Sequence, residues 1–194
     1  MEGSSCKPIS LNEELCEIKI QIKETLIEKN KLYGDSALNP RRVMSKVSSA
    51  EGIAIRLDDK INRLLNSPVS SKTKHKIFRK NDVFDTIGYS ILYTIATTRE
   101  SDDTEKSFSK EIDDAIEKIF LPSSDEESLL PTILDGIKIG SIKSEEMFFT
   151  CLDKIVKDAM SGEVPTLISV FNLSKLCLYI AAFRNFSYFD DQID

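Results

Sequence analysis

Apolar residues recur every three or four positions along much of this chain, and that spacing determines which fold class the chain can adopt. Ile18, Ile22 and Leu26 fall on one face of a helix. We expect this helix to end near Tyr33, because Gly34 can take the left-handed conformation that closes helices. Glycine and proline, which interrupt helices, number only 7 and 6 among 194 residues. The sequence therefore predicts an all-α protein built as a helical bundle.

Six further stretches have helical periodicity, and they fall into two halves. The expected helices cover residues 50–65, 82–98, 109–120, 127–138, 142–160 and 166–185. A polar linker, residues 100–108, separates an N-terminal half (1–99) from a C-terminal half (109–194). The segment EGIAIRLDDKI (51–61) can be aligned with EEMFFTCLDKI (145–155). This similarity favours two tandem half-bundles, and chance similarity between amphipathic helices is the alternative.

The composition argues against several classes of protein. The net charge of −6 argues against binding to duplex DNA, and no apolar run approaches the roughly 20 residues of a membrane-spanning helix. The four cysteines are scattered and there is a single histidine, His75, so a structural zinc site is not expected. Scattered cysteines without a signal peptide indicate free thiols in the cytoplasm.

Charged residues divide between the two edges of the expected helix 50–65. With Leu57 at the centre of the buried face, Glu51 and Asp58 fall on one edge of the helix. The opposite edge carries the cations Arg56, Lys60 and Arg63. One edge therefore offers carboxylates, and the other offers positive charge.

The expected helix 82–98 presents two further acids, because Asp82 and Asp85 are three residues apart and share a face. If the two helices pack antiparallel, their acidic edges can meet and bring together carboxylates that too few cations neutralise. A hard divalent cation relieves such repulsion, because it prefers oxygen ligands. The pattern predicts a site for Mg²⁺, or for Mn²⁺ in its place, formed by Glu51, Asp58, Asp82 and Asp85.

Each of these side chains also has a purely structural interpretation. Ser48 and Glu51 have the spacing of a capping box, in which the serine and the glutamate each bond the backbone of the other. Asp82, at a helix start, stabilises the helix dipole. Lys60 and Arg63 can form a solvated face.

Four segments taken together resemble one family. They are YGDSALNP (33–40), SKVSSAEGI (45–53), RLDDKINRL (56–64) and NDVFDTIGYSIL (81–92). The family is the nucleotide-modification-associated domain of phages and bacteria, which is related to the all-α nucleoside triphosphate pyrophosphohydrolases. That superfamily includes the MazG-like enzymes, the dimeric dUTPases and the dCTP pyrophosphatases. The resemblance covers residues 11–98 and implies a helical bundle of the MazG-like type, completed by dimerisation or by a degenerate second half without the acids.

The resemblance also implies which residues carry chemistry. The superfamily binds Mg²⁺ through a Glu-Glu-x-x-Glu set on one helix and a Glu-x-x-Asp set on the next. Asp82-x-x-Asp85 matches the second set, with Asp in place of Glu. The first set is absent, and Glu51, Asp58 and Asp59 stand in its place. Asp58 and Asp85 are the two residues carried over as catalytic ligands.

The implied function is Mg²⁺-dependent hydrolysis of a nucleoside triphosphate or modified nucleotide to monophosphate and pyrophosphate. Lys60 and Arg63 would neutralise the phosphates. Tyr33 and Tyr89 would contact the base, with core packing as the alternative for Tyr33. The rival is a protein that binds a nucleotide or a nucleotide-derived signal without chemistry, which in a phage would serve base modification or evasion of host defence. A third class is a structural subunit, homo-oligomeric through the apolar helix 167–186.

Overall fold

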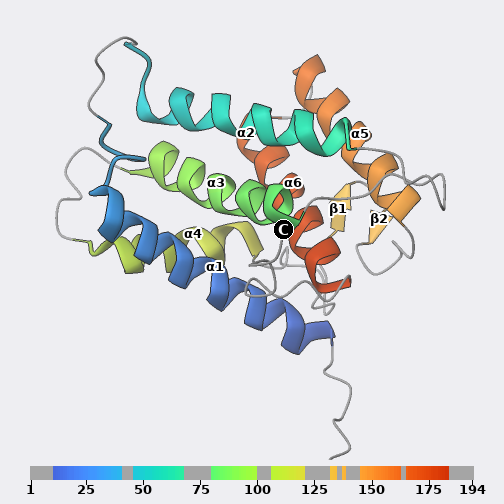
Figure 1. The fold of residues 1–194 in the computed structure, drawn as a ribbon. Helices are drawn as coiled ribbons and strands as arrows, with labels where there is room; N and C mark the ends of the chain where they lie inside the picture. The colour runs from blue at the N-terminus through green and yellow to red at the C-terminus, as the bar shows by residue number, and fades with distance from the viewer. Residues whose placement is uncertain are drawn as a thin grey trace, which may run out of the picture.

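The computed structural model describes residues 11–40, 46–67, 80–99, 106–120, 132–134, 137–138, 145–162 and 165–183. Within these residues the chain forms six helices and one small hairpin (Figure 1). The elements are α1 Leu11–Tyr33, α2 Ser49–Leu65, α3 Lys80–Thr98, α4 Phe108–Phe120, β1 Thr132–Leu134, β2 Ile137–Lys138, α5 Glu145–Ser161 and α6 Thr166–Phe183. The predicted all-α helical bundle is confirmed.

The ends of α1 and α2 follow signals that the sequence carries. Gly34 has a φ of +60°, and its N–H donates to the carbonyl of Asn30 at 2.9 Å, so α1 ends at Tyr33 as predicted. At the start of α2 the Ser48 hydroxyl accepts from the Glu51 N–H at 3.2 Å. The Glu51 carboxylate in turn accepts from the Ser48 N–H at 2.6 Å. The predicted capping box is therefore present, and it employs the Glu51 side chain.

The prediction of a helix at 127–138 is wrong where the structure describes this segment. β1 and β2 pair there as antiparallel strands, with Thr132 opposite Lys138. The sequence between the two strands is Asp135-Gly136. Asp-Gly between short runs of β-branched residues is a strong hairpin signal, and it outweighed the helical spacing of the apolar residues.

The hydrophobic core is centred on α3 and α6, which are the most buried of the described helices. α3 lies between α2 on one side and α1 with α4 on the other (Figure 1). α6 packs against α3, α5 and α1. Three hydroxyls of α3 are fully buried, those of Thr86, Ser90 and Thr94, and each donates to the backbone carbonyl four residues earlier. Because these bonds satisfy the hydroxyls within α3, the helix can be buried on most sides without outside partners.

Helices from both predicted halves contribute to this core, and two ion pairs fix α4 against the N-terminal helices. Lys23 Nζ of α1 lies 2.6 Å from Asp113 Oδ1 of α4. Arg99, just after α3, donates through Nε and Nη2 to the buried Glu111 carboxylate at 2.8 and 3.0 Å. Such a two-point contact is among the stronger side-chain interactions, so α4 is held beside α1 and the end of α3.

None of the helices that the structure describes is long and apolar enough to cross a membrane. Cys16, Cys151 and Cys177 are free thiols, as predicted. Burial raises the pKa of both Cys151 and Cys177. Cys6 and His75 lie outside the described residues.

Candidate functional site

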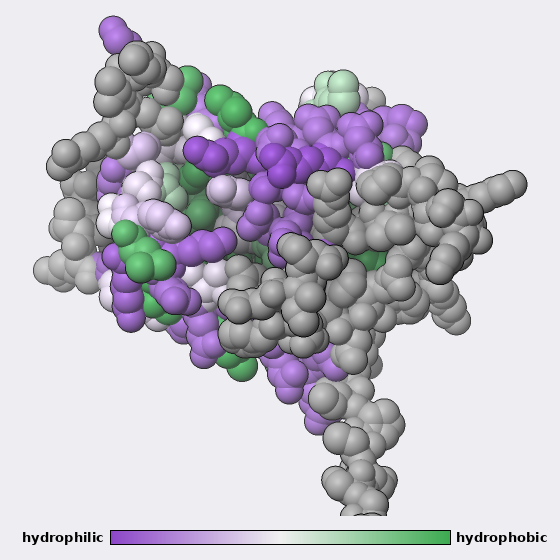
Figure 2. All heavy atoms as spheres, viewed as in Figure 1, coloured by the Kyte–Doolittle hydropathy of each residue, from purple (hydrophilic) through white to green (hydrophobic). Residues whose placement is uncertain are grey.

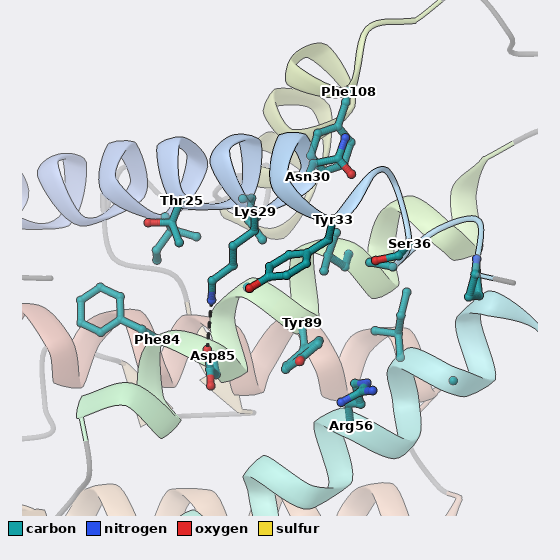
Figure 3. Close-up of a pocket in the computed structure, with 18 residues that line it drawn as sticks. Thr25, Lys29, Asn30, Tyr33, Ser36, Arg56, Phe84, Asp85, Tyr89 and Phe108 are labelled. Carbon is teal, nitrogen blue, oxygen red and sulfur yellow. Dashed lines mark ion pairs between the residues drawn. The ribbon is translucent and has the colours of Figure 1, made fainter.

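A pocket of about 630 Å³ lies between α1, α2 and α3 (Figure 3). This volume falls within the roughly 300–1,000 Å³ that is typical of small-molecule sites. Figure 2 shows hydrophobic residues at the base of the hollow between α1 and α2. The outer surface of α2 is hydrophilic over its later turns and carries hydrophobic residues near its start. The pocket thus combines an apolar interior with a polar rim.

Aromatic side chains from three helices line this pocket. Phe84 and Tyr89 reach it from α3, Tyr33 reaches it from the end of α1, and Phe108 reaches it from the start of α4 (Figure 3). Phe84 is buried and Tyr89 is half-buried, whereas Tyr33 is 68% exposed and therefore does not pack in the core. Three buried or half-buried rings and one more accessible ring offer apolar surface to a planar heterocycle.

The loop after α1 is held in place as the rim of the pocket. Gly34 and Asp35 both have left-handed backbone angles, with φ of +60° and +51°. The backbone N–H of Asn39 donates to the Asp35 carbonyl at 2.8 Å, and the Asn39 side-chain amide donates to the Asp35 carboxylate. Leu38 is buried and anchors the loop in the core. These contacts fix the turn that brings Ser36 to the pocket wall.

The acids of α3 face the basic edge of α2. Lys60 Nζ lies 2.8 Å from Asp85 Oδ2 and 3.7 Å from Asp82 Oδ1. Arg63 Nη1 lies 3.8 Å from Asp82 Oδ1. From α1, Lys29 Nζ lies 3.8 Å from Asp85 Oδ1 (Figure 3). The Asp82 side chain is buried, with only 4% of the residue exposed, and a buried carboxylate needs a counter-charge. Lys60 and Arg63 provide that charge.

Lys60 is the central cation of this network. Burial alone would lower its pKa, and the charge of Arg63 acts in the same direction. The hydrogen bond and charge of Asp85, together with the charge of Asp82, outweigh both effects. The pKa of Lys60 is therefore raised above its ordinary value of 10.5, and the side chain stays charged at neutral pH.

The expectation that the acidic edges of the two helices would meet is wrong. α2 is rotated so that Lys60 and Arg63 face α3. Asp58 instead lines a separate cavity of about 100 Å³, which α5 and α6 help to form. Opposite charges attract across the α2–α3 interface, whereas facing carboxylates would repel each other. The sequence shows which charges share an edge of α2, but not which edge turns toward α3.

The predicted site residues lie in three places. Those that line the pocket are Tyr33, Asp85 and Tyr89. Those that form the adjoining ion-pair network are Lys60, Arg63, Asp82 and again Asp85. Those that lie apart from both are Glu51, in the capping box, and Asp58, at the cavity beside α5 and α6. The structure thus does not bring the four predicted metal ligands to one place.

The described side chains do not form a metal site on their own. Among them, no group of three or more histidine, cysteine, aspartate or glutamate residues could hold an ion. Asp82 and Asp85 are the two acids of the predicted set that lie together, and Lys60 contacts both. This arrangement does not fit a Mg²⁺ ion held by the protein alone, because the Lys60 ammonium group already neutralises the two carboxylates that would bind the ion. Mg²⁺ binding stays a prediction.

Two pocket cations are missing from the residues that sequence reasoning assigned to the site, Lys29 of α1 and Arg56 of α2. Arg56 shares the basic edge of α2 with Lys60 but lies one turn earlier, where it lines the pocket (Figure 3). Lys29 and Tyr33 are four residues apart on α1 and therefore share a face. That spacing is the sequence signal that would have identified Lys29.

These two pocket cations have no strong partners among the described residues. The 3.8 Å between Lys29 Nζ and Asp85 Oδ1 exceeds a hydrogen-bond length, and the Lys29 side chain is 51% exposed. Arg56 is exposed and has no ion-pair or hydrogen-bond partner in the described part of the chain. Both side chains are therefore available to a ligand.

Comparison with known proteins gives no match for this chain. No protein family matches it, and neither a curated protein nor a solved structure is significantly similar to it. The residues of the pocket therefore carry the functional argument.

Proposed function

We propose that the chain binds a nucleotide or a nucleotide-derived small molecule in the pocket between α1, α2 and α3. The observation that carries this proposal is that aromatic rings and available cations line one cavity. A planar base stacks on aromatic rings, and a phosphate pairs with arginine and lysine. A nucleotide has both a base and a phosphate, so it can contact the aromatic rings and the cations of the pocket at the same time.

Each part of such a ligand has a matching wall. The base lies against Tyr89, and Tyr33 is the more exposed ring that covers it from α1. The planar guanidinium of Arg56 can bind two phosphate oxygens, and Lys29 adds a second positive charge. Arg56 and Tyr89 line the same pocket (Figure 3), so one nucleotide, whose sugar separates its base from its phosphate, can contact both.

Lys60 supports the site without contacting the ligand. Asp85 is the one carboxylate among the described residues that line the pocket, and Lys60 Nζ lies 2.8 Å from it. An unneutralised Asp85 would repel a phosphate at this short range. In this proposal Lys60 and Arg63 neutralise the acids of α3, so that these acids do not repel an anion in the pocket.

The test is equilibrium binding of a panel of canonical and modified nucleotides, measured as a ligand-dependent rise in Tm and as a calorimetric Kd. Arg56→Gln removes the pocket charge, and we expect it to weaken binding by about tenfold. Lys31→Gln is the matched control, because Lys31 is exposed on α1 and is not among the described residues of the pocket. Equal affinity in Arg56→Gln and Lys31→Gln would contradict the proposal.

A second candidate function is hydrolysis of a nucleoside triphosphate to monophosphate and pyrophosphate. The observation that favours it is the Asp85 carboxylate at the wall of the same pocket, with Asp82 one turn earlier on α3. A carboxylate in that position can orient an attacking water. The test is release of pyrophosphate in Mg²⁺ or Mn²⁺ and then in chelator.

Two variants make this second test specific. Turnover that Asp85→Asn abolishes and Asp153→Asn retains would establish hydrolysis, because Asp153 is exposed on α5 away from the pocket. Nucleotide binding without release of pyrophosphate would contradict hydrolysis and support the proposal of a binding protein.

A further inference from the structure

We infer that a second, smaller cavity binds a short amino alcohol, which carries an ammonium group at one end and a hydroxyl at the other. This cavity has a volume of about 100 Å³ and lies where α2, α5 and α6 meet (Figure 1). A cavity of about 150 Å³ holds benzene, so this one has space for about four non-hydrogen atoms. It shares no described residue with the proposed nucleotide pocket and does not depend on nucleotide binding.

Buried apolar side chains form the walls of this cavity. Leu57 of α2, Ile155 of α5 and Leu173 of α6 line it, and each is at most 4% exposed. All three belong to the hydrophobic core, so the walls are in place without a ligand. Walls of this kind favour the methylene groups that join the two polar ends of an amino alcohol.

A buried hydroxyl in the cavity wall lacks a partner among the described residues. Ser169 is only 6% exposed, and its Oγ forms no hydrogen bond with them. The buried hydroxyls of α3 each donate to the carbonyl four residues earlier. For Ser169 that carbonyl belongs to Pro165, which already accepts the N–H groups of Ile168 and Ser169 at 2.9 and 3.1 Å. A buried hydroxyl without a partner is unfavourable, and the hydroxyl of a ligand removes that penalty.

A carboxylate marks the open end of the cavity. Asp58 lines the cavity from α2, is exposed, and forms no ion pair in the described part of the chain. The neighbouring Asp59, in contrast, pairs with Arg63 at 3.0 Å. An ammonium group beside Asp58 contacts the carboxylate and stays near water, so its charge is not buried. Asp58 thus favours a cation at this end, and Ser169 bonds the hydroxyl at the other.

The experiment is an NMR titration of the full chain with ethanolamine, at constant ionic strength and at neutral pH, where an alkylamine is charged. The amides of Leu57, Ala159 and Ser169, which line the cavity, should show saturable shifts. The expected Kd lies between about 0.1 and about 10 mM, because so small a ligand binds weakly. Propylamine and ethylene glycol are probes of the same size that lack the hydroxyl and the ammonium group, respectively. Each should bind at least about threefold more weakly.

Variants test the two ends of the ligand separately. Asp58→Asn should weaken ethanolamine binding about tenfold and leave ethylene glycol binding unchanged. Ser169→Ala should weaken ethanolamine binding about threefold to tenfold and leave propylamine binding unchanged, and it should fold because it removes an unsatisfied hydroxyl. Asp59→Asn is the matched control, since Asp59 is exposed on α2 but is not among the described residues of the cavity.

Three results would overturn the proposed amino alcohol site. Absence of saturable shifts at the cavity amides would show that the cavity holds water only. Equal affinity for ethanolamine and propylamine would show that Ser169 does not bond the ligand. Equal ethanolamine affinity in Asp58→Asn and Asp59→Asn would show that Asp58 does not select a cation. Each of these results leaves the proposed nucleotide binding intact.

Discussion

Lys60 of α2 and Asp85 of α3 are joined across the helix interface, with 2.8 Å between Lys60 Nζ and Asp85 Oδ2. The same ammonium group lies 3.7 Å from Asp82 Oδ1, so one lysine neutralises two acids at the wall of the pocket. This contact removes negative charge from a cavity that would otherwise repel a phosphate. It also holds α2 in the rotation that brings Arg56 to the pocket.

Replacing this lysine should destabilise the fold, because Lys60→Met leaves two acids without their main counter-charge. We expect a loss of about 2–4 kcal/mol in the free energy of unfolding. The loss should be smaller than for a fully buried pair, since the Asp85 side chain is 31% exposed. Urea unfolding measures it, and Arg63→Gln is the control, because the 52% exposed Arg63 should contribute less than about 1 kcal/mol. Equal losses in the two variants would show that Lys60 has no special position.

The same pair predicts a loss of stability at high pH. Burial lowers the pKa of Lys60, but Asp85 and Asp82 raise it further, so its folded value lies above 10.5. The contribution of the pair is therefore fully present below pH 10.5 and is lost as the pH rises through the raised value. The difference in unfolding free energy between wild type and Lys60→Met should stay constant at lower pH and shrink over the interval that begins at pH 10.5 and extends above it. A difference that stays constant over this interval would contradict the pairing.

Gly88 in α3 should separate stability from binding. A Cβ atom added there would lie 3.6 Å from Leu26 Cδ2, which is an ordinary contact. Because alanine is the better residue inside a helix, Gly88→Ala should raise the unfolding free energy by about 0.4–1 kcal/mol. The new methyl group also enters the lining of the pocket, so nucleotide affinity should fall. Urea unfolding and calorimetric titration of one preparation measure both effects. A Gly88→Ala variant that is less stable than the wild type would show that position 88 has no space for a methyl group.

Gly34 should be needed for its backbone conformation and not for space. Its φ is +60°, and a Cβ atom there would meet nothing within 4 Å. Gly34→Ala should therefore lower the unfolding free energy by about 1–2 kcal/mol through the left-handed backbone alone. Gly34→Asn is the matched variant, because asparagine tolerates this conformation, and it should lose clearly less in the same unfolding experiment. Equal losses would mean that something other than φ limits this position.

Local signals were enough to predict the N-terminal helices and their ends. Gly34 marked the end of α1, and the spacing of Ser48 and Glu51 marked the start of α2. The hairpin at β1 and β2 could also have been predicted, because Asp135-Gly136 is a direct signal for it.

The rotation of α2 could not be predicted in the same way. The amphipathic pattern places Asp58 on one edge of α2 and Lys60 on the other, and either edge is compatible with a buried face centred on Leu57. Contacts with the acids of α3 decide between them. For the same reason Tyr89 was assigned to the site and Arg56 was not, because the sequence does not show which helix faces converge on the pocket.

The central claim is that a nucleotide occupies the pocket between α1, α2 and α3, and amide chemical-shift mapping by NMR tests it most directly. Titration with the best-binding nucleotide of the panel should shift the amides of Asn30, Gly52, Gly88 and Tyr89, which line the pocket. Amides of α5, such as that of the 83% exposed Met160, should stay unchanged. Shifts centred on α5 and α6, or no shifts at high nucleotide concentration, would contradict the claim.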